Sequence, residues 1–192
     1  MSGIDRRAFV RQLLAHCPEA LVVTGLGSPS WDAFAAGDRE RTFYLWGAMG
    51  GAAAMGLGLA LAQPQRSVLV VTGDGEQLMG LGVLATIGAQ QPPNLAVVVL
   101  DNGHYGETGM QRSHTSLGTD LVAVARGCGF AQAQSIRDPE AAAALASRIR
   151  ARDGCLLAQV HVACEELPKA LPARDGVYLK NRFRAALGLP PF

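Results

Sequence analysis

The sequence predicts an α/β fold, in which a parallel sheet carries helices on both faces, and a single three-layer domain over residues 1–192. Apolar runs typical of strands alternate along the chain with segments typical of helices. The strand runs are continuously apolar, which indicates strands that are covered on both faces. With 192 residues, 49% of them apolar and 17% charged, the chain is long enough to build one complete core.

The elements follow one another in strand–helix order. Asp5 and Asp138 suit helix N-caps, and Pro139 suits the first turn that follows Asp138. The expected helices are residues 5–16, 31–35, 47–63, 77–90, 120–126, 138–150 and 180–187. The expected strands are residues 20–24, 42–46, 67–72, 95–100, 130–134 and 156–162. A long polar loop is expected at residues 101–119, and the tail at residues 165–192 is expected to pack on a partner.

Charge and cysteine content exclude several classes of function. The formal net charge of +1 gives no global field that would attract nucleic acid or a membrane surface. None of the four cysteines belongs to a C-x-x-C pair, so the sequence indicates no zinc site or iron–sulfur cluster. We expect reduced, buried thiols in a cytoplasmic protein, because no secretory leader opens the chain and no apolar run is long enough to span a membrane.

Polar motifs follow two of the predicted strands at the point where each strand ends. Gly73-Asp74-Gly75-Glu76 comes after one strand, and Asp101-Asn102-Gly103 comes after the next. Ligands of parallel sheets bind beyond the carboxyl ends of the strands, and one crossover helix separates these two. A carboxylate and an amide oxygen side by side suit Mg²⁺, while the glycines and the following helix N-terminus suit a phosphate.

The spacing from Gly73 to Asn102 resembles the cofactor-binding motif of thiamine diphosphate (ThDP) dependent enzymes. The resemblance implies that the Asp74 and Asn102 side chains and the His104 carbonyl bind Mg²⁺. It also implies that Gly73, Gly75, Glu76 and Tyr105 belong to the cofactor site. Glu76 departs from the small residue of many members, and an acid there should repel a phosphate unless its side chain points away.

A second segment of this family's site appears upstream, at Gly47-Ala48-Met49-Gly50. By resemblance, Met49 supports the bent cofactor, and the Gly47 carbonyl accepts a hydrogen bond from the cofactor's amino group. Gly25-Leu26-Gly27 also resembles the start of a dinucleotide fingerprint, but the third glycine and the acidic strand end are missing.

Longer stretches, at residues 43–50, 84–88 and 101–111, resemble the β subunit of sulfopyruvate decarboxylases and the C-terminal part of phosphonopyruvate decarboxylases. The resemblance covers most of the chain and implies a ThDP-dependent lyase that decarboxylates a 2-oxo acid. Asp101 replaces the first Asn of the commoner pair, as in those decarboxylases. Met110 replaces their glycine, which leaves the substrate open.

The resemblance also implies that a partner is needed. In this family the glutamate that activates the cofactor comes from a separate pyrimidine-binding domain, for which this chain has no room. We therefore expect a hetero-oligomer with a pyrimidine-domain (α-type) subunit, and no catalytic residue is assigned within this chain.

The loop after Asn102 is mildly basic. One interpretation is that Thr108, Gln111, Arg112 and His114 face an anionic 2-oxo acid, and the other is a solvated loop. Two further alternatives remain for the function. One is a ThDP-dependent carboligase or a subunit of an oxidative 2-oxo acid enzyme, and the other is a regulatory or relic subunit without turnover.

Overall fold

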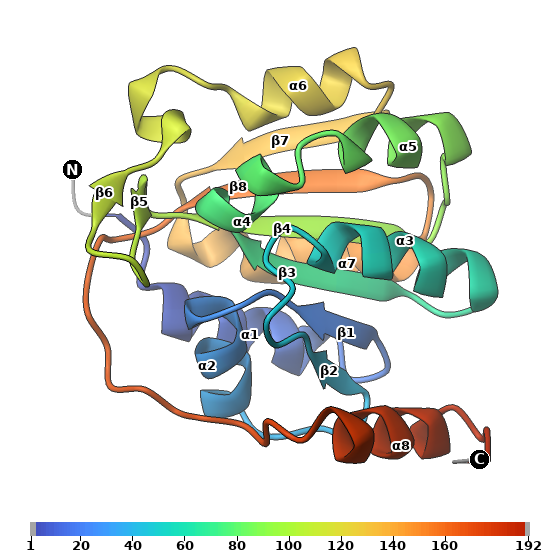
Figure 1. Cartoon of the computed structure of the whole chain (residues 1–192). Helices are drawn as coiled ribbons and strands as arrows, with labels where there is room; N and C mark the ends of the chain where they lie inside the picture. Colours follow the sequence, from blue (N-terminus) through green and yellow to red (C-terminus); the bar gives the residue numbers. More distant parts are fainter. Residues whose placement is uncertain (1–2, 191–192) are drawn as a thin grey trace.

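The computed structural model describes residues 3–190, and its centre is a six-stranded parallel sheet (Figure 1). The strand order is β2-β1-β3-β4-β8-β7, with all neighbours parallel. The strands are β1 (Leu21–Thr24), β2 (Thr42–Tyr44), β3 (Val68–Gly73), β4 (Leu95–Asp101), β7 (Gln132–Ile136) and β8 (Leu156–His161). The predicted parallel sheet is confirmed.

Helices cover both faces of the sheet. One face carries α1 (Arg6–His16), α2 (Ser28–Ala35) and α7 (Ala142–Ala151), which follows the 3-10 turn η2 (Pro139–Ala141). The other face carries α3 (Ala52–Ala62), α4 (Asp74–Met79), α5 (Val83–Gln90) and α6 (Leu121–Gly127). The last helix, α8 (Gly176–Ala186), lies beside the edge strand β2 (Figure 1). No helix among residues 3–190 is long and apolar enough to cross a membrane.

Alternate residues of each central strand enter the two separate cores, which explains why the strands are continuously apolar. In β3, Leu69 and Val71 pack against the first helical layer, whereas Val68 and Val70 pack against the second. All four side chains are fully buried. A polar residue at any of these positions would therefore be buried in one core or the other.

The residues before α3 form a turn, so the prediction that a helix begins at Gly47 is wrong. Gly47 has φ 71° and Gly50 has φ 92°, which lie in the left-handed region and are incompatible with an α-helix. The helix begins only at Ala52. This turn places Met49 beside the ends of the strands rather than on a helix surface.

The single helix predicted at residues 77–90 is two helices, α4 and α5. α4 begins earlier than expected, at Asp74, and it ends at Met79, with Gly80 as its C-cap. A Cβ atom on Gly80 would lie 2.2 Å from the Gly50 carbonyl oxygen. The turn before α3 therefore packs directly on the residues between α4 and α5. Helix periodicity in the sequence does not reveal such a contact between distant segments.

The predicted loop at residues 101–119 contains short ordered elements. β5 (His104–Tyr105) and β6 (Gln111–Arg112) form an antiparallel hairpin, and the 3-10 turn η1 (His114–Leu117) follows. The hairpin lies at the carboxyl edge of the sheet, next to the end of β4 (Figure 1).

The C-terminal tail contacts its own domain. Arg182 Nη1 donates to Asp38 Oδ2 over 2.6 Å, and the Phe183 ring packs edge-on against Phe43 of β2. The outer side of α8 stays exposed, with Val177 at 65% and Tyr178 at 50%. α8 begins four residues before the predicted helix because Asp175 caps it. Packing of the tail on a partner stays a prediction.

Candidate cofactor and metal site

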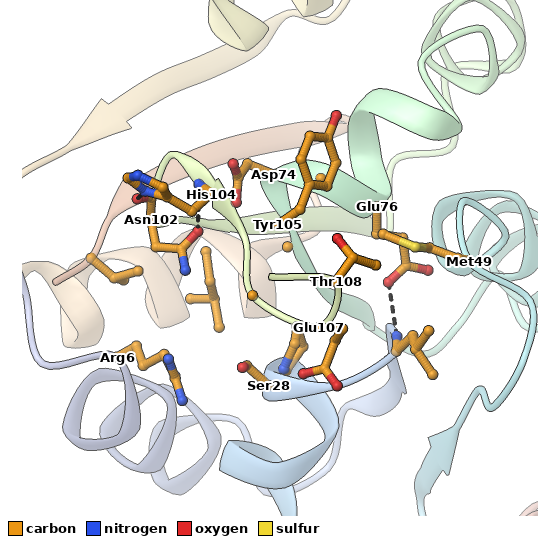
Figure 2. Close-up of a pocket in the computed structure, with 17 residues that line it drawn as sticks. Arg6, Ser28, Met49, Asp74, Glu76, Asn102, His104, Tyr105, Glu107 and Thr108 are labelled. Atoms are coloured by element: carbon orange, nitrogen blue, oxygen red, sulfur yellow. Dashed lines mark hydrogen bonds between the residues drawn. The ribbon is translucent and has the colours of Figure 1, made fainter. Parts of the chain in front are cut away.

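The two polar strand ends lie side by side, as the sequence predicts. β3 and β4 are hydrogen-bonded neighbours, with Gly73 opposite Leu100, so Asp74 and Asn102 follow adjacent strands. A cavity of about 80 Å³ opens above them (Figure 2). Of the predicted site residues, it is lined by Met49, Gly73, Asp74, Gly75, Glu76, Asn102, His104, Tyr105 and Thr108.

Asp74 is the buried carboxylate of this site. It is the first residue of α4, and only 2% of its surface is exposed. Its Oδ2 atom accepts a hydrogen bond from the Ser113 hydroxyl, and the Thr115 hydroxyl oxygen lies 3.3 Å from the same atom. The pKa of Asp74 is raised to about 6, mainly by burial and also by the nearby charge of Asp101, against the lowering effect of the Ser113 hydrogen bond. A bound cation would relieve this cost of burying a charge.

Asp101 is a second buried carboxylate, directly behind the site. Its Oδ1 accepts from the Gly103 amide over 2.9 Å and from the Thr115 hydroxyl over 2.8 Å. Its Oδ2 accepts from the Gln159 side chain over 2.6 Å. With its oxygens occupied by these donors, Asp101 supports the loop rather than facing the cavity.

Asn102 and His104 form a tight turn at the end of β4. The Asn102 side-chain oxygen accepts from the His104 amide over 2.9 Å, and the His104 ring nitrogen Nδ1 lies 2.9 Å from the Asn102 carbonyl oxygen. An amide oxygen has a second lone pair, so this turn still leaves a position for a metal.

The oxygen atoms that the site offers are suited to bind Mg²⁺ together with phosphate oxygens. They are one carboxylate, one side-chain amide oxygen and one main-chain carbonyl, all of them hard oxygen ligands. Within residues 3–190 there is no group of three or more His, Cys, Asp or Glu side chains that could hold a metal. The remaining ligands would therefore come from the cofactor and from water, as is usual for Mg²⁺.

The Glu76 side chain lines the cavity and reaches toward the loop after β1. Its Oε2 atom accepts from the Leu26 amide over 2.9 Å (Figure 2), while Oε1 has no hydrogen-bond partner. Burial raises the pKa of this carboxyl. A Cβ atom on Gly25 would lie 1.7 Å from Oε2, so only glycine leaves room for the carboxylate. The acid therefore supports the loop after β1.

A glycine, an aromatic ring and a methionine shape the remaining wall. A Cβ atom on Gly75 would lie 2.6 Å from Cδ1 of Tyr105, so the hairpin packs directly on the start of α4. Met49 reaches the cavity from the turn before α3 (Figure 2). Gly47 is exposed and does not line this cavity, so its expected contact with the cofactor stays a prediction.

The predicted substrate residues are only partly brought to the cavity. Thr108 lines it, whereas Gln111, Arg112 and His114 do not, and all four are exposed. The Arg112 side chain folds back onto its own loop, where its Nε donates to Ser116 Oγ over 3.2 Å.

Sequence reasoning missed one side of the site. Arg6, Leu26, Ser28, Pro29 and Glu107 also line the cavity. Ser28 and Pro29 open α2, whose N-cap is Gly27 with φ 75°. A glycine followed by Ser-Pro at a strand end is a helix-start pattern, and it could have indicated a further N-terminus directed at an anion.

Comparison with known proteins agrees with this geometry. Residues 30–160 match the family described as "Thiamine pyrophosphate enzyme, C-terminal TPP binding domain". The chain belongs to this family of ThDP-binding domains.

Among curated relatives, phosphonopyruvate decarboxylase of Streptomyces viridochromogenes is 41% identical, over 97% of this chain and 47% of that protein. Sulfopyruvate decarboxylase subunit beta of Methanocaldococcus jannaschii is 47% identical, over 57% of this chain and 58% of that protein. The chain thus spans about half the length of these relatives. A putative thiamin diphosphate-dependent enzyme from Mycobacterium smegmatis has the same fold, with a TM-score of 0.72 and 22% identity over 85% of this chain and 32% of that one.

Proposed function

We propose that this chain is the cofactor-anchoring part of a ThDP- and Mg²⁺-dependent decarboxylase of a 2-oxo acid. The observation that carries the proposal is the placement of Asp74 and Asn102 on adjacent strand ends, around one cavity that Met49 also lines. The names of the relatives, phosphonopyruvate decarboxylase and sulfopyruvate decarboxylase subunit beta, support the class of reaction.

The residues of this chain bind and orient the cofactor. Asp74, the Asn102 side chain and the His104 carbonyl hold Mg²⁺, which in turn holds the diphosphate. Gly73 and Gly75 let the main chain approach the phosphates, and the N-terminus of α2 adds a favourable dipole. When bound, ThDP would supply a nucleophilic carbanion and an acceptor for the electron pair that stays behind when CO₂ leaves. None of these side chains transfers a proton to or from the substrate.

A pyrimidine-domain subunit completes the site in this proposal. The name "subunit beta" of several relatives supports such a partner. The outer side of α3 is also suited to an interface, because this helix contains no polar residue and leaves Ala54, Gly58 and Leu61 exposed. We propose a cytoplasmic hetero-oligomer in which the partner's glutamate activates the cofactor.

The substrate is proposed to be a pyruvate that carries a second anionic group, such as sulfopyruvate or phosphonopyruvate. In this view Thr108, Gln111, Arg112 and His114 approach the substrate when the β5–β6 hairpin meets the partner. Replacing Arg112 with Ala should then raise KM for the anionic 2-oxo acid. An unchanged KM would show that Arg112 does not contribute to substrate binding.

The proposal is tested by measuring CO₂ release from a panel of 2-oxo acids. The protein is assayed in its natural assembly, with ThDP and Mg²⁺, and the products are identified by mass spectrometry. Decarboxylation to an aldehyde is the expected result. A 2-hydroxy ketone as the main product would indicate the carboligase alternative, and no CO₂ from any 2-oxo acid would refute the decarboxylase.

A further inference from the structure

Ser113 connects the two halves of the proposed metal site. It follows β6 and is fully buried, although its neighbours Arg112 and His114 are exposed. Its hydroxyl donates to Asp74 Oδ2, which belongs to the end of β3. Its main-chain amide donates to the Gly103 carbonyl over 2.8 Å, which belongs to the end of β4. One residue thus holds both strand ends at once.

The hydroxyl protons can be assigned by counting donors. Each hydroxyl has one proton, and both carboxylates are acceptors when ionised. The Ser113 hydroxyl lies closest to Asp74, whereas the Thr115 hydroxyl lies closest to Asp101, at 2.8 Å, and is farther from the Ser113 hydroxyl, at 2.9 Å, and from Asp74, at 3.3 Å. The Ser113 proton therefore goes to Asp74, and the Thr115 proton goes to Asp101. Both hydroxyls approach Asp74 on Oδ2, which leaves Oδ1 to face a cation.

We propose that Ser113 is a positioning residue for the metal and does not touch it. Its hydroxyl fixes the carboxylate of Asp74, and its amide fixes the turn that presents the Asn102 side chain and the His104 carbonyl. The spacing between ligands on the two strands then depends on Ser113. This inference rests on the metal site of the proposed function, and it adds a residue outside the recognised motif.

The first test measures Mn²⁺ affinity, with Mn²⁺ as the probe, by electron paramagnetic resonance on the assembled protein with ThDP. Groups that orient a metal ligand typically contribute about 10–100-fold to metal affinity. We expect Ser113→Ala to weaken Mn²⁺ binding by about that factor and Ser113→Thr, which keeps the hydroxyl, to restore most of it. Ser147→Ala is the control, because that exposed hydroxyl lies on α7 and its hydrogen bonds stay within its own helix.

The Mn²⁺ affinities distinguish an error about the role of Ser113 from an error about the metal site itself. If wild type binds Mn²⁺ and Ser113→Ala binds it equally well, the positioning role is wrong. If wild type binds no Mn²⁺, the proposed metal site is wrong. Should Ser113→Ala fail to fold, Ser113→Cys replaces the hydroxyl with a weak donor at the same position, and a smaller loss of affinity is expected; affinity equal to that of wild type would again refute the positioning role.

A second test needs no metal. Hydrogen exchange on the protein without cofactor should be faster at residues 103–105 in Ser113→Ala than in wild type, because the turn loses its link to the start of α4. Ser113→Thr should exchange like wild type. Equal protection in Ser113→Ala and wild type would show that Ser113 does not hold the two strand ends together.

Discussion

The ends of β3 and β4 contribute to the same site but are built differently. β3 passes directly into α4, and the Asp74 side chain is 2% exposed. β4 passes into the β5–β6 hairpin, where Asn102 and His104 are half-buried and the tip at residues 106–111 is exposed. The first half is fixed by a strand and a helix, whereas the second is fixed by hydrogen bonds within a loop.

This difference indicates a division of roles. The β3 end supplies the one carboxylate among the proposed metal ligands and a rigid position, at the cost of burying a carboxylate. The β4 end supplies neutral oxygens on a segment that can adjust to a cofactor, a substrate or a partner. Substitutions at the β3 end should therefore weaken Mg²⁺-dependent ThDP binding most, and substitutions at the β4 end should weaken it less.

The largest effect is expected for Asp74→Asn. Because it removes the site's only carboxylate ligand, Mg²⁺-dependent ThDP binding should fall by more than about 100-fold, beyond the range for residues that merely orient a ligand. The fold without metal should gain about 1 kcal/mol, because a buried charge is removed. Isothermal titration calorimetry and urea unfolding at pH 7 measure the two effects, and tight binding by the variant would contradict the assignment.

Asn102→Ala should weaken binding less than Asp74→Asn. The lost ligand is neutral, and water can take its place, so we expect a loss of about 10-fold. The same calorimetric titration compares the two variants. A larger loss for Asn102→Ala would reverse the proposed ranking of the two strand ends.

The contact between the halves is tested by a pair of glycine variants. Gly75→Ala places a Cβ atom 2.6 Å from the Tyr105 ring and should destabilise the fold by about 1–3 kcal/mol. Gly58→Ala, on the exposed side of α3, meets no atom within 4 Å and should stabilise it by about 0.5–1 kcal/mol. Both values come from urea unfolding. If the two variants changed the free energy of unfolding equally, the hairpin would not pack on α4.

The smallest effect concerns His161, beside Asp101 at the end of β8. Burial lowers the pKa of His161, the charge of Arg137 lowers it further, and Asp101 and Asp120 raise it. Since the folded pKa lies below the unfolded value of about 6.5, the contribution of His161 to stability is present above that pH and is lost as pH falls. His161→Gln should therefore flatten the fall in unfolding free energy from pH 7 to pH 5, and an unchanged slope would exclude this residue as its source.

Local sequence was sufficient for the central strands and for the placement of the polar residues at their ends. The apolar runs identified the sheet, and the position of Asp74 and Asn102 after successive strands predicted that they lie around one cavity. Asp5, Asp120, Asp138 and Asp175 cap the helices or turns that follow them, as such residues do in many proteins.

What sequence reasoning did not predict depends on contacts between distant segments. The direction of Glu76 is set by the Leu26 amide, which belongs to a different strand end. The break between α4 and α5 reflects the packing of Gly80 on Gly50. Ser113 gains its role only when the hairpin returns it to Asp74, 39 residues away in the sequence. None of these three contacts leaves a periodic or spaced pattern in the sequence.

The central claim is that this chain holds ThDP through a metal bound between the ends of β3 and β4. Its most direct test is calorimetric titration of the assembled protein with ThDP, in Mg²⁺ and in excess EDTA, for wild type and Asp74→Asn. We predict binding by wild type in Mg²⁺ only, and none by the variant in either condition. Binding that persists equally in EDTA, or in Asp74→Asn, would contradict the account.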